Sequence, residues 1–263
     1  MTGVKQFSLF TGWLLANNAL YVYEYCDTAK QLSAQEQELD IISQQFYGMM
    51  PKNFRRNFLI QNPGSLFVQY PFSPLKQYMT RHYVITNNYS LIVAWGKASV
   101  VFEKYGIYLI KNNPGAFIHY FLFLNLKNYF IPHLEKLEIY NLGQESVDPI
   151  ASFWFHYKTD KISAFSKRAQ GFILYLFPLL FMAINLYYLI CALLIWIKDH
   201  IRQLAYNSRC LFYISITFLF SNLVFCVFAT IIVLRYEVMP MIICLATSLL
   251  MTEWVFKRNK IYK

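Results

Sequence analysis

The last third of the chain contains three long runs of apolar residues separated by short polar segments. The runs cover residues 172–197, 211–234 and 238–256, and Glu253 is the one charged residue inside them. A helix needs about 20 apolar residues to cross a hydrocarbon core of about 30 Å, and each run reaches or approaches that length. The pattern therefore predicts three transmembrane helices, which together make up a transmembrane region over residues 171–263.

Residues 1–170 show a different pattern, in which helical spacing alternates with turn-forming residues. Ser33 followed by Glu36 matches a capping box and predicts a helix that reaches residue 47. A second helix is predicted over residues 90–112, because an asparagine before a proline resists the helical conformation and ends it. The same proline suits the first turn of a third helix, over residues 114–128.

The third predicted helix carries large apolar side chains at helical spacing. They predict a face packed against a core, the alternative being a helix that lies in a membrane interface. Between residues 62 and 89, several turn formers instead predict an irregular, partly extended chain. The predicted fold class is therefore mainly α and integral membrane: a helical region with irregular links over residues 1–170, then a three-helix transmembrane bundle. The apolar residues are Phe117, Tyr120, Phe121 and Leu124, and the turn formers are Pro63, Gly64, Pro71 and Pro74.

The composition agrees with this class and excludes several others. Hydrophobic residues make up 57% of the chain and charged residues only 14%, whereas about a quarter of a soluble domain is charged. The net charge of +10 includes no run of five or more Lys or Arg, so no nucleic-acid partner is expected. The five cysteines lack CxxC spacing and the five histidines lack HExxH spacing, so we expect no metal and no other cofactor.

The basic residues that flank the apolar runs predict how the helices are oriented. Seven of them lie in the link 198–209 and the tail 257–263, whereas the turn 235–240 carries one arginine and one glutamate. Basic residues accumulate in cytoplasmic loops. We therefore expect the link and the C-terminus to be cytoplasmic, and residues 1–170 to be extracytoplasmic.

Two groups of charged residues at the predicted membrane boundaries are candidate binding residues. Arg235, with Glu237, is the candidate contact for a lipid phosphate, because a guanidinium is a permanently charged, planar fork. The alternatives are that Arg235 pairs with Glu237 or that both are snorkelling anchors. A second group of bases precedes the first run and could contact anionic headgroups, or could be ordinary charges flanking a helix. This group is Lys158, Lys161, Lys167 and Arg168.

Four blocks of sequence suggest a family. In order along the chain they are residues 11–21; residues 128–130 with 132–137 and 140–141; residues 148–149 with 154–158; and residues 233–236 with Pro240. They resemble blocks of large multi-spanning membrane proteins of Bacteroidota-type bacteria. Those proteins are classed as glycosyltransferases of the GT-C superfamily and are similar to dolichyl-phosphate-mannose and aminoarabinose transferases. The resemblance covers nearly the whole chain but only the C-terminal part of such a protein.

The resemblance implies a function in cell-envelope glycan assembly that uses a polyprenyl-phosphate-linked sugar. The expected location is the bacterial inner (plasma) membrane, with several crossings. The expected partners are membrane lipid, the polyprenyl-phosphate sugar and a missing N-terminal transmembrane part.

Catalysis by this chain alone is not expected. The superfamily keeps its catalytic acid on a first extracytoplasmic loop that this sequence does not contain, so no catalytic residue is assigned. Acidic pairs occur at Glu135/Glu138 and Glu145/Asp148. The first pair lies three positions apart on a predicted helix and is interpreted as a solvated face, the alternative being a general acid. Two functions therefore stay open: the C-terminal portion of a membrane glycosyltransferase, and a non-enzymatic membrane scaffold or accessory protein of envelope polysaccharide assembly.

Overall fold

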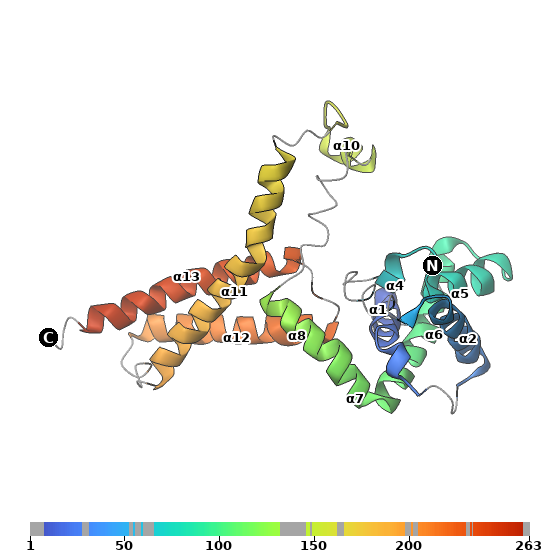
Figure 1. The fold of residues 1–263 in the computed structure, drawn as a ribbon, viewed down its shortest axis with the longest axis horizontal. Coiled ribbons are helices and arrows are strands. Elements are labelled where there is room, and N and C mark those ends of the chain that lie inside the picture. Colours follow the sequence, from blue (N-terminus) through green and yellow to red (C-terminus); the bar gives the residue numbers. More distant parts are fainter. Residues whose placement is uncertain are drawn as a thin grey trace. The chain divides into compact units, whose positions relative to one another are not determined.

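The described part of the chain is helical (Figure 1). Its one β contact is an isolated antiparallel bridge between Ser146 and Lys161. These observations confirm the mainly α fold class. The computed structural model describes residues 8–27, 32–52, 55, 59, 66–131, 146–147, 149–161, 166–197, 201, 205–229, 232 and 234–259.

The contacts between residues divide the chain into two compact units. Unit 1 comprises Met1–Leu126 and Cys226–Ile231, and unit 2 comprises Lys127–Phe225 and Ile232–Lys263. The boundary predicted between residues 170 and 171 separates the transmembrane region from the rest of the chain and stays a prediction. It falls within α11 (Lys167–Ile197), the first long apolar helix, which lies inside unit 2.

Unit 1 is built from short helices around one apolar core. The buried side chains of its core lie between Trp13 and Phe121 in the sequence. The elements are α1 (Leu9–Leu20), the 3₁₀-helix η1 (Tyr23–Tyr25), α2 (Ala34–Gly48), α4 (Leu66–Gln69), α5 (Pro74–Tyr78), the π-helix η2 (Met79–Ile85), α6 (Leu91–Asn112), α7 (Pro114–Ala116), the π-helix η3 (Phe117–Leu122) and the first residues of α8 (Phe123–Phe130).

The helices predicted in this unit are confirmed, with one addition. The Glu36 carboxylate accepts the backbone N–H of Ser33 at 2.8 Å, as a capping box requires at the start of α2. Helix α6 ends at Asn112, as predicted. The third helix has a π-helical middle, η3, between α7 and α8. Phe117 and Phe121 on it are buried in the core of unit 1, whereas Leu124 is only partly buried and Tyr120 is exposed. The core-facing interpretation therefore holds for part of the predicted face.

The prediction of an irregular chain between residues 62 and 89 is wrong for the described part, which is helical over residues 66–69 and 74–85. Pro74 occupies the start of α5, where a missing N–H costs nothing, and the Ser73 hydroxyl accepts the N–H of Lys76 at 3.2 Å. The turn formers therefore begin a helix instead of preventing one. Pro63 and Gly64 lie outside the described residues.

Helices α1 and α6 approach each other closely because glycines face the contact. A Cβ atom at Gly12 would lie 1.8 Å from the carbonyl oxygen of Ser99 on α6. A Cβ atom at Gly106 would lie 2.6 Å from the carbonyl carbon of Leu15 on α1. Such separations are possible only without a side chain, so the two backbones pack directly on each other.

Unit 2 contains three helices that are long and apolar enough to cross a membrane. Between 22% and 39% of the residues in their most apolar windows are buried inside the structure, so most of their apolar side chains face outward. The helices are α11 (Lys167–Ile197), α12 (Tyr206–Ala229, whose last residues belong to unit 1) and α13 (Leu234–Asn259), drawn from gold to red in Figure 1.

The connection between the second and third apolar helices lies earlier than the sequence predicted. Helix α12 ends at Ala229 and α13 begins at Leu234, so the predicted turn over 235–240 is part of α13. Pro240 is accommodated inside α13.

Helices α11 and α13 share a polar seam. The Tyr187 hydroxyl on α11 lies 2.5 Å from the Thr252 hydroxyl on α13, and Cys191 Sγ lies 3.4 Å from the same oxygen. Because the Thr252 hydroxyl also donates to the Ser248 carbonyl at 2.8 Å, Tyr187 is the donor to Thr252. Hydrogen bonds of this kind join apolar helices where water offers no competition.

Replacing either close-packed glycine by alanine should destabilise unit 1. We expect Gly12→Ala to cost about 1–3 kcal/mol or more, because its methyl group would overlap a backbone carbonyl that cannot rotate away. Thermal unfolding of the detergent-purified chain measures the effect. Gly48→Ala and Gly115→Ala are matched controls, because nothing lies within 4 Å of their added Cβ atoms. Equal melting temperatures for Gly12→Ala and the controls would contradict the close approach.

Candidate functional site

The basic residues predicted to contact headgroups lie around the start of α11. Lys158 and Lys161 are exposed in a loop that follows the short helix α10 (Pro149–Phe155). Lys161 pairs with Ser146 in the isolated bridge. Lys167 and Arg168 form the first turn of α11, and the Arg168 side chain is exposed. The structure therefore places Lys158 and Lys161 in one closed loop.

The candidate lipid-phosphate residues both lie in the first turn of α13. Arg235 belongs to the helix and not to a preceding turn, which corrects its predicted place at the end of the second helix. Glu237 is fully buried there. A carboxylate in the first helical turn is favoured by the partial positive charge of the helix N-terminus. The acidic residues Glu135, Glu138, Glu145 and Asp148 lie outside the described residues.

The most fully built polar cluster is in unit 1 and surrounds a buried carboxylate. Asp40 on α2 is 6% exposed. Its Oδ1 atom accepts the hydroxyl of Tyr23 at 2.9 Å and the hydroxyl of Tyr105 at 2.8 Å. Its Oδ2 atom accepts Nε2 of Gln44, one helical turn later, at 3.0 Å. Asp40 therefore joins η1, α2 and α6 through three hydrogen bonds to one side chain.

The environment of Asp40 keeps its neighbours neutral. Burial, and then the Asp40 charge, raises the pKa of the Tyr23 hydroxyl well above its ordinary value. Burial likewise raises the pKa of Tyr105, with further contributions from Tyr23 and Asp40. Burial and Asp40 raise the pKa of the Cys26 thiol to about 12. Both tyrosines therefore remain hydrogen-bond donors, and Cys26 stays a thiol without the reactivity of a thiolate.

This cluster is suited to holding helices together and not to proton transfer. Every oxygen of the Asp40 carboxylate accepts a donor, and hydrogen bonds to a charged acceptor are about twice as strong as neutral ones. A general base must instead be within reach of a substrate, whereas the Asp40 side chain is buried among its donors. We interpret Asp40 as a structural anchor of unit 1.

A second acidic residue of α2 contacts a histidine on η2. Oε2 of Glu38 lies 3.1 Å from Nδ1 of His82, and both side chains are partly exposed. The imidazole also stacks on the Tyr78 ring, with centroids 5.3 Å apart and planes 7° apart. A carboxylate at Nδ1 fixes the orientation of the ring. The contact attaches η2 to α2 on the surface of unit 1.

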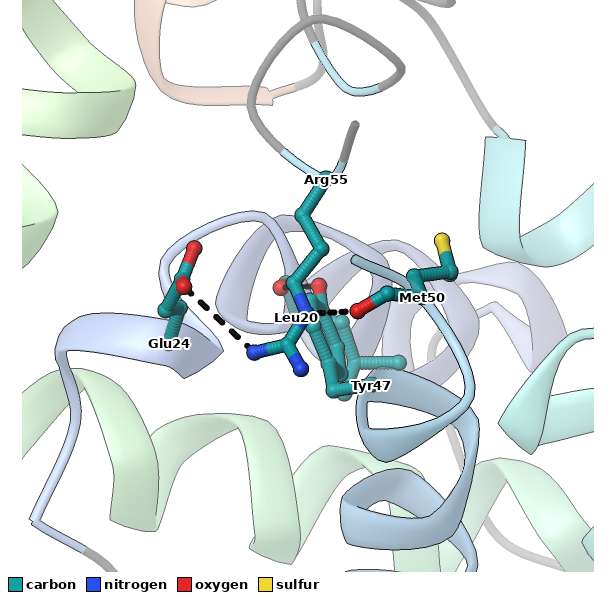
Figure 2. A network of polar contacts seen from close by, with 5 residues as sticks. All are labelled: Leu20, Glu24, Tyr47, Met50 and Arg55. Carbon is teal, nitrogen blue, oxygen red and sulfur yellow. Dashed lines mark hydrogen bonds and ion pairs between the residues drawn. The ribbon is translucent and has the colours of Figure 1, made fainter. Parts of the chain in front are cut away.

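A third polar network fastens the chain after α2 to the end of α1 (Figure 2). Arg55 Nη1 lies 3.4 Å from Glu24 Oε1, and Arg55 Nε donates to the Met50 carbonyl at 2.7 Å. In the same view, the Tyr47 hydroxyl donates to the carbonyl of Leu20, which is the last residue of α1. Glu24, like Glu38 and Asp40, is therefore used to connect elements.

Sequence patterns gave no signal for these clusters. Asp40 and Tyr105 are 65 positions apart, and Glu38 and His82 are 44 positions apart. Neither pair lies within one helix, where spacing would reveal it. The apolar surroundings of Tyr105 on α6 indicate only that the residue is buried. Tertiary packing alone identifies its hydrogen-bond partner.

Removing the charge of Asp40 should loosen α2 and α6. Asp40→Asn places an amide donor among three donors, which leaves a buried polar group unsatisfied at a cost of about 1–3 kcal/mol. Hydrogen exchange should then show protection of α2 and α6 amides reduced by about 5- to 150-fold. Asp27→Asn makes the same chemical change at an exposed position and is the control. Unchanged protection in Asp40→Asn would show that the carboxylate is not an anchor.

Comparison with known proteins gives no match. No family model, no curated protein and no solved structure matches the chain. The inferences about its function therefore come from the chemistry of its own residues and from the sequence blocks described above.

Proposed function

We propose that the chain is a multi-pass membrane protein in which α11, α12 and α13 cross the bilayer. The observation that carries this proposal is the outward-facing apolar surface of these helices, since at most 39% of each apolar window is buried. In water that surface would be unfavourable by about 25 cal/mol for each Å² exposed. In lipid it is the expected surface, and the internal hydrogen bonds of a helix satisfy the backbone.

The proposed orientation places the C-terminus in the cytoplasm and residues 1–170 on the other side. The distribution of basic residues supports it, as does the small number of charges between α12 and α13. The polar seam of Tyr187, Cys191 and Thr252 supports a paired arrangement of α11 and α13 within the bilayer. The proposed location is a bacterial inner membrane.

We further propose that this membrane protein takes part in envelope glycan assembly as a portion of a polyprenyl-phosphate-sugar glycosyltransferase. The first block of the resemblance, residues 11–21, overlaps α1. Several of its residues have packing roles: Gly12 contacts α6, the Trp13 ring stacks on Trp95 at 3.8 Å, and Asn17 accepts the N–H of Phe67 at 3.0 Å. This block of the resemblance thus consists largely of residues that pack inside unit 1, whereas the other three blocks belong to unit 2.

The non-enzymatic alternative, a scaffold or accessory protein, is favoured by a separate observation. Glu24, Glu38 and Asp40 each contact a residue of another element. Their carboxylates are therefore used in structure, and this suits a supporting role for unit 1. Transfer of sugar from a polyprenyl-phosphate donor by the purified chain, abolished by a substitution within it, would contradict that role.

Accessibility to a membrane-impermeant maleimide tests the proposed crossings. In a cysteine-free background, a Lys158→Cys label should react from outside intact cells, whereas Lys263→Cys should react only after permeabilisation. Three crossings separate the two positions, so they must lie on opposite sides. Labelling of both from the same side would contradict three crossings, and the reverse pattern would contradict the orientation alone.

A role of Arg235 in binding lipid phosphate predicts a difference between its two substitutions. Arg235→Ala should weaken binding of a fluorescent polyprenyl phosphate in nanodiscs by about tenfold or more. Arg235→Lys should weaken it less, because lysine keeps the charge but loses the bidentate fork.

The same substitutions at Arg258, near the other end of α13, are the matched controls and should leave binding unchanged. Equal binding by the wild type and Arg235→Ala would make Arg235 an anchor only.

A further inference from the structure

The loop before α11 exposes a dense group of large apolar side chains. Between 52% and 74% of the surface of each is exposed, and α10 contains no buried residue. The rings contact one another: Phe153 and Trp154 have centroids 6.4 Å apart, and Phe155 and Tyr157 stack at 5.7 Å. The group, called here the aromatic tip, is Ile150, Phe153, Trp154, Phe155 and Tyr157.

The aromatic tip is not arranged to pack on a core. At 3.6 residues per turn, three consecutive aromatic residues spread over about 200° of the helix circumference. A helix that packs on a core concentrates its apolar residues on one face. Residues 153–155 instead point in several directions and remain exposed in each. Side chains exposed in several directions would be favourable if an apolar medium surrounded the tip, because each of them would then be removed from water.

The backbone of the loop holds the tip in place. The bridge between Ser146 and Lys161 closes the loop at its base, and the N–H of Val147 donates to the carbonyl of Asp160 at 2.6 Å. His156 has a φ of 52°, in the left-handed region, and ends α10 after Phe155. The tip is thus a closed protrusion of the chain.

Positive charge accompanies the tip. Residues 156–168 contain four Lys or Arg and one acidic residue, Asp160. Lys158, Lys161 and Arg168 are exposed. Aromatic residues beside bases are the composition of segments that lie in the headgroup layer of an anionic membrane. Helix α11, one of the candidate spans, begins ten residues after Tyr157.

We propose that the aromatic tip inserts into the headgroup layer of the leaflet where α11 begins, with Lys158, Lys161 and Arg168 contacting anionic lipid headgroups. This inference rests on the proposed crossing of the membrane by α11. Trp and Tyr rings favour that layer because one part of each ring is apolar and another forms hydrogen bonds. The loop is then an interfacial anchor that fixes the depth of α11.

Fluorescence quenching in vesicles tests the insertion. Trp154→Cys in a cysteine-free full-length chain carries an environment-sensitive label, and lipids carry a nitroxide either near the headgroup or near the bilayer centre. The label at 154 should be quenched by the shallow nitroxide. A label at Leu186→Cys, an exposed position near the middle of the α11 span, should be quenched by the deep one, and a label at Gln35→Cys on α2 by neither.

The outcomes separate this inference from the proposed membrane crossing. If position 186 is quenched and position 154 is not, the tip faces water or a protein partner, and the inference is overturned while the crossing stands. If position 186 is not quenched by the deep nitroxide, the crossing of α11 fails, and the inference fails with it. Quenching at both positions with the expected depths supports both.

The charge contribution has its own test. In vesicles with phosphatidylglycerol, quenching at 154 should exceed that in phosphatidylcholine alone, because each base near an anionic surface changes partitioning about fivefold. Replacing Lys158, Lys161 and Arg168 by glutamine should abolish the difference. Replacing the exposed Lys104, Lys111 and Lys127 by glutamine removes the same charge elsewhere and should preserve it. Equal lipid dependence in both triple variants would overturn the role of these bases.

Discussion

The direct backbone contact between α1 and α6 is the constraint on which unit 1 depends. At Gly12 and Gly106 the two helices are so close that a Cβ atom added to either glycine would overlap the backbone of the other helix. At that separation the Trp13 indole N–H reaches the Trp95 carbonyl at 3.1 Å, and the two indole rings stack. The Lys76 ammonium on α5 lies 4.4 Å from the centre of the Trp95 ring. Burial disfavours the charged form of Lys76 and lowers its pKa. Cation–π attraction to the ring acts in the opposite direction and favours the charged form.

Polar side chains join further elements of unit 1 to this helix pair. Asp40 gathers Tyr23, Tyr105 and Gln44, so a single carboxylate connects three elements. A buried carboxylate without hydrogen bonds would be costly, whereas one with all its donors fixes the positions of its neighbours. The polar residues of unit 1 thus determine which helices meet, and its aromatic residues fill the space between them.

Unit 2 follows a different principle. Its three long helices bury few of their apolar side chains against one another, so their stability depends on the medium around them. Within that surface, the hydroxyls of Tyr187 and Thr252 form a localised contact between α11 and α13. The aromatic tip adds side chains suited to the boundary between lipid and water, beside bases suited to anionic headgroups. In the proposed membrane setting, the apolar helices, the aromatic tip and the neighbouring bases would together fix how deeply unit 2 lies in the bilayer.

The sequence by itself determined the long apolar helices and the predicted helices of unit 1, because run length, capping residues and proline position act over a few neighbouring residues. It did not determine where α12 ends, since no charged residue interrupts positions 211–234 and a largely apolar run does not mark a change of direction. The candidate bases at 158 and 161 could be selected from their position, but their closed loop depends on a bridge to Ser146. The contacts of Asp40, the use of Gly12 and the exposure of residues 153–155 were decided only by tertiary structure. Each of these three features depends on which segment, distant in the sequence, packs against the residue or fails to do so. The spacing of residues within one helix carries no information about that distant segment.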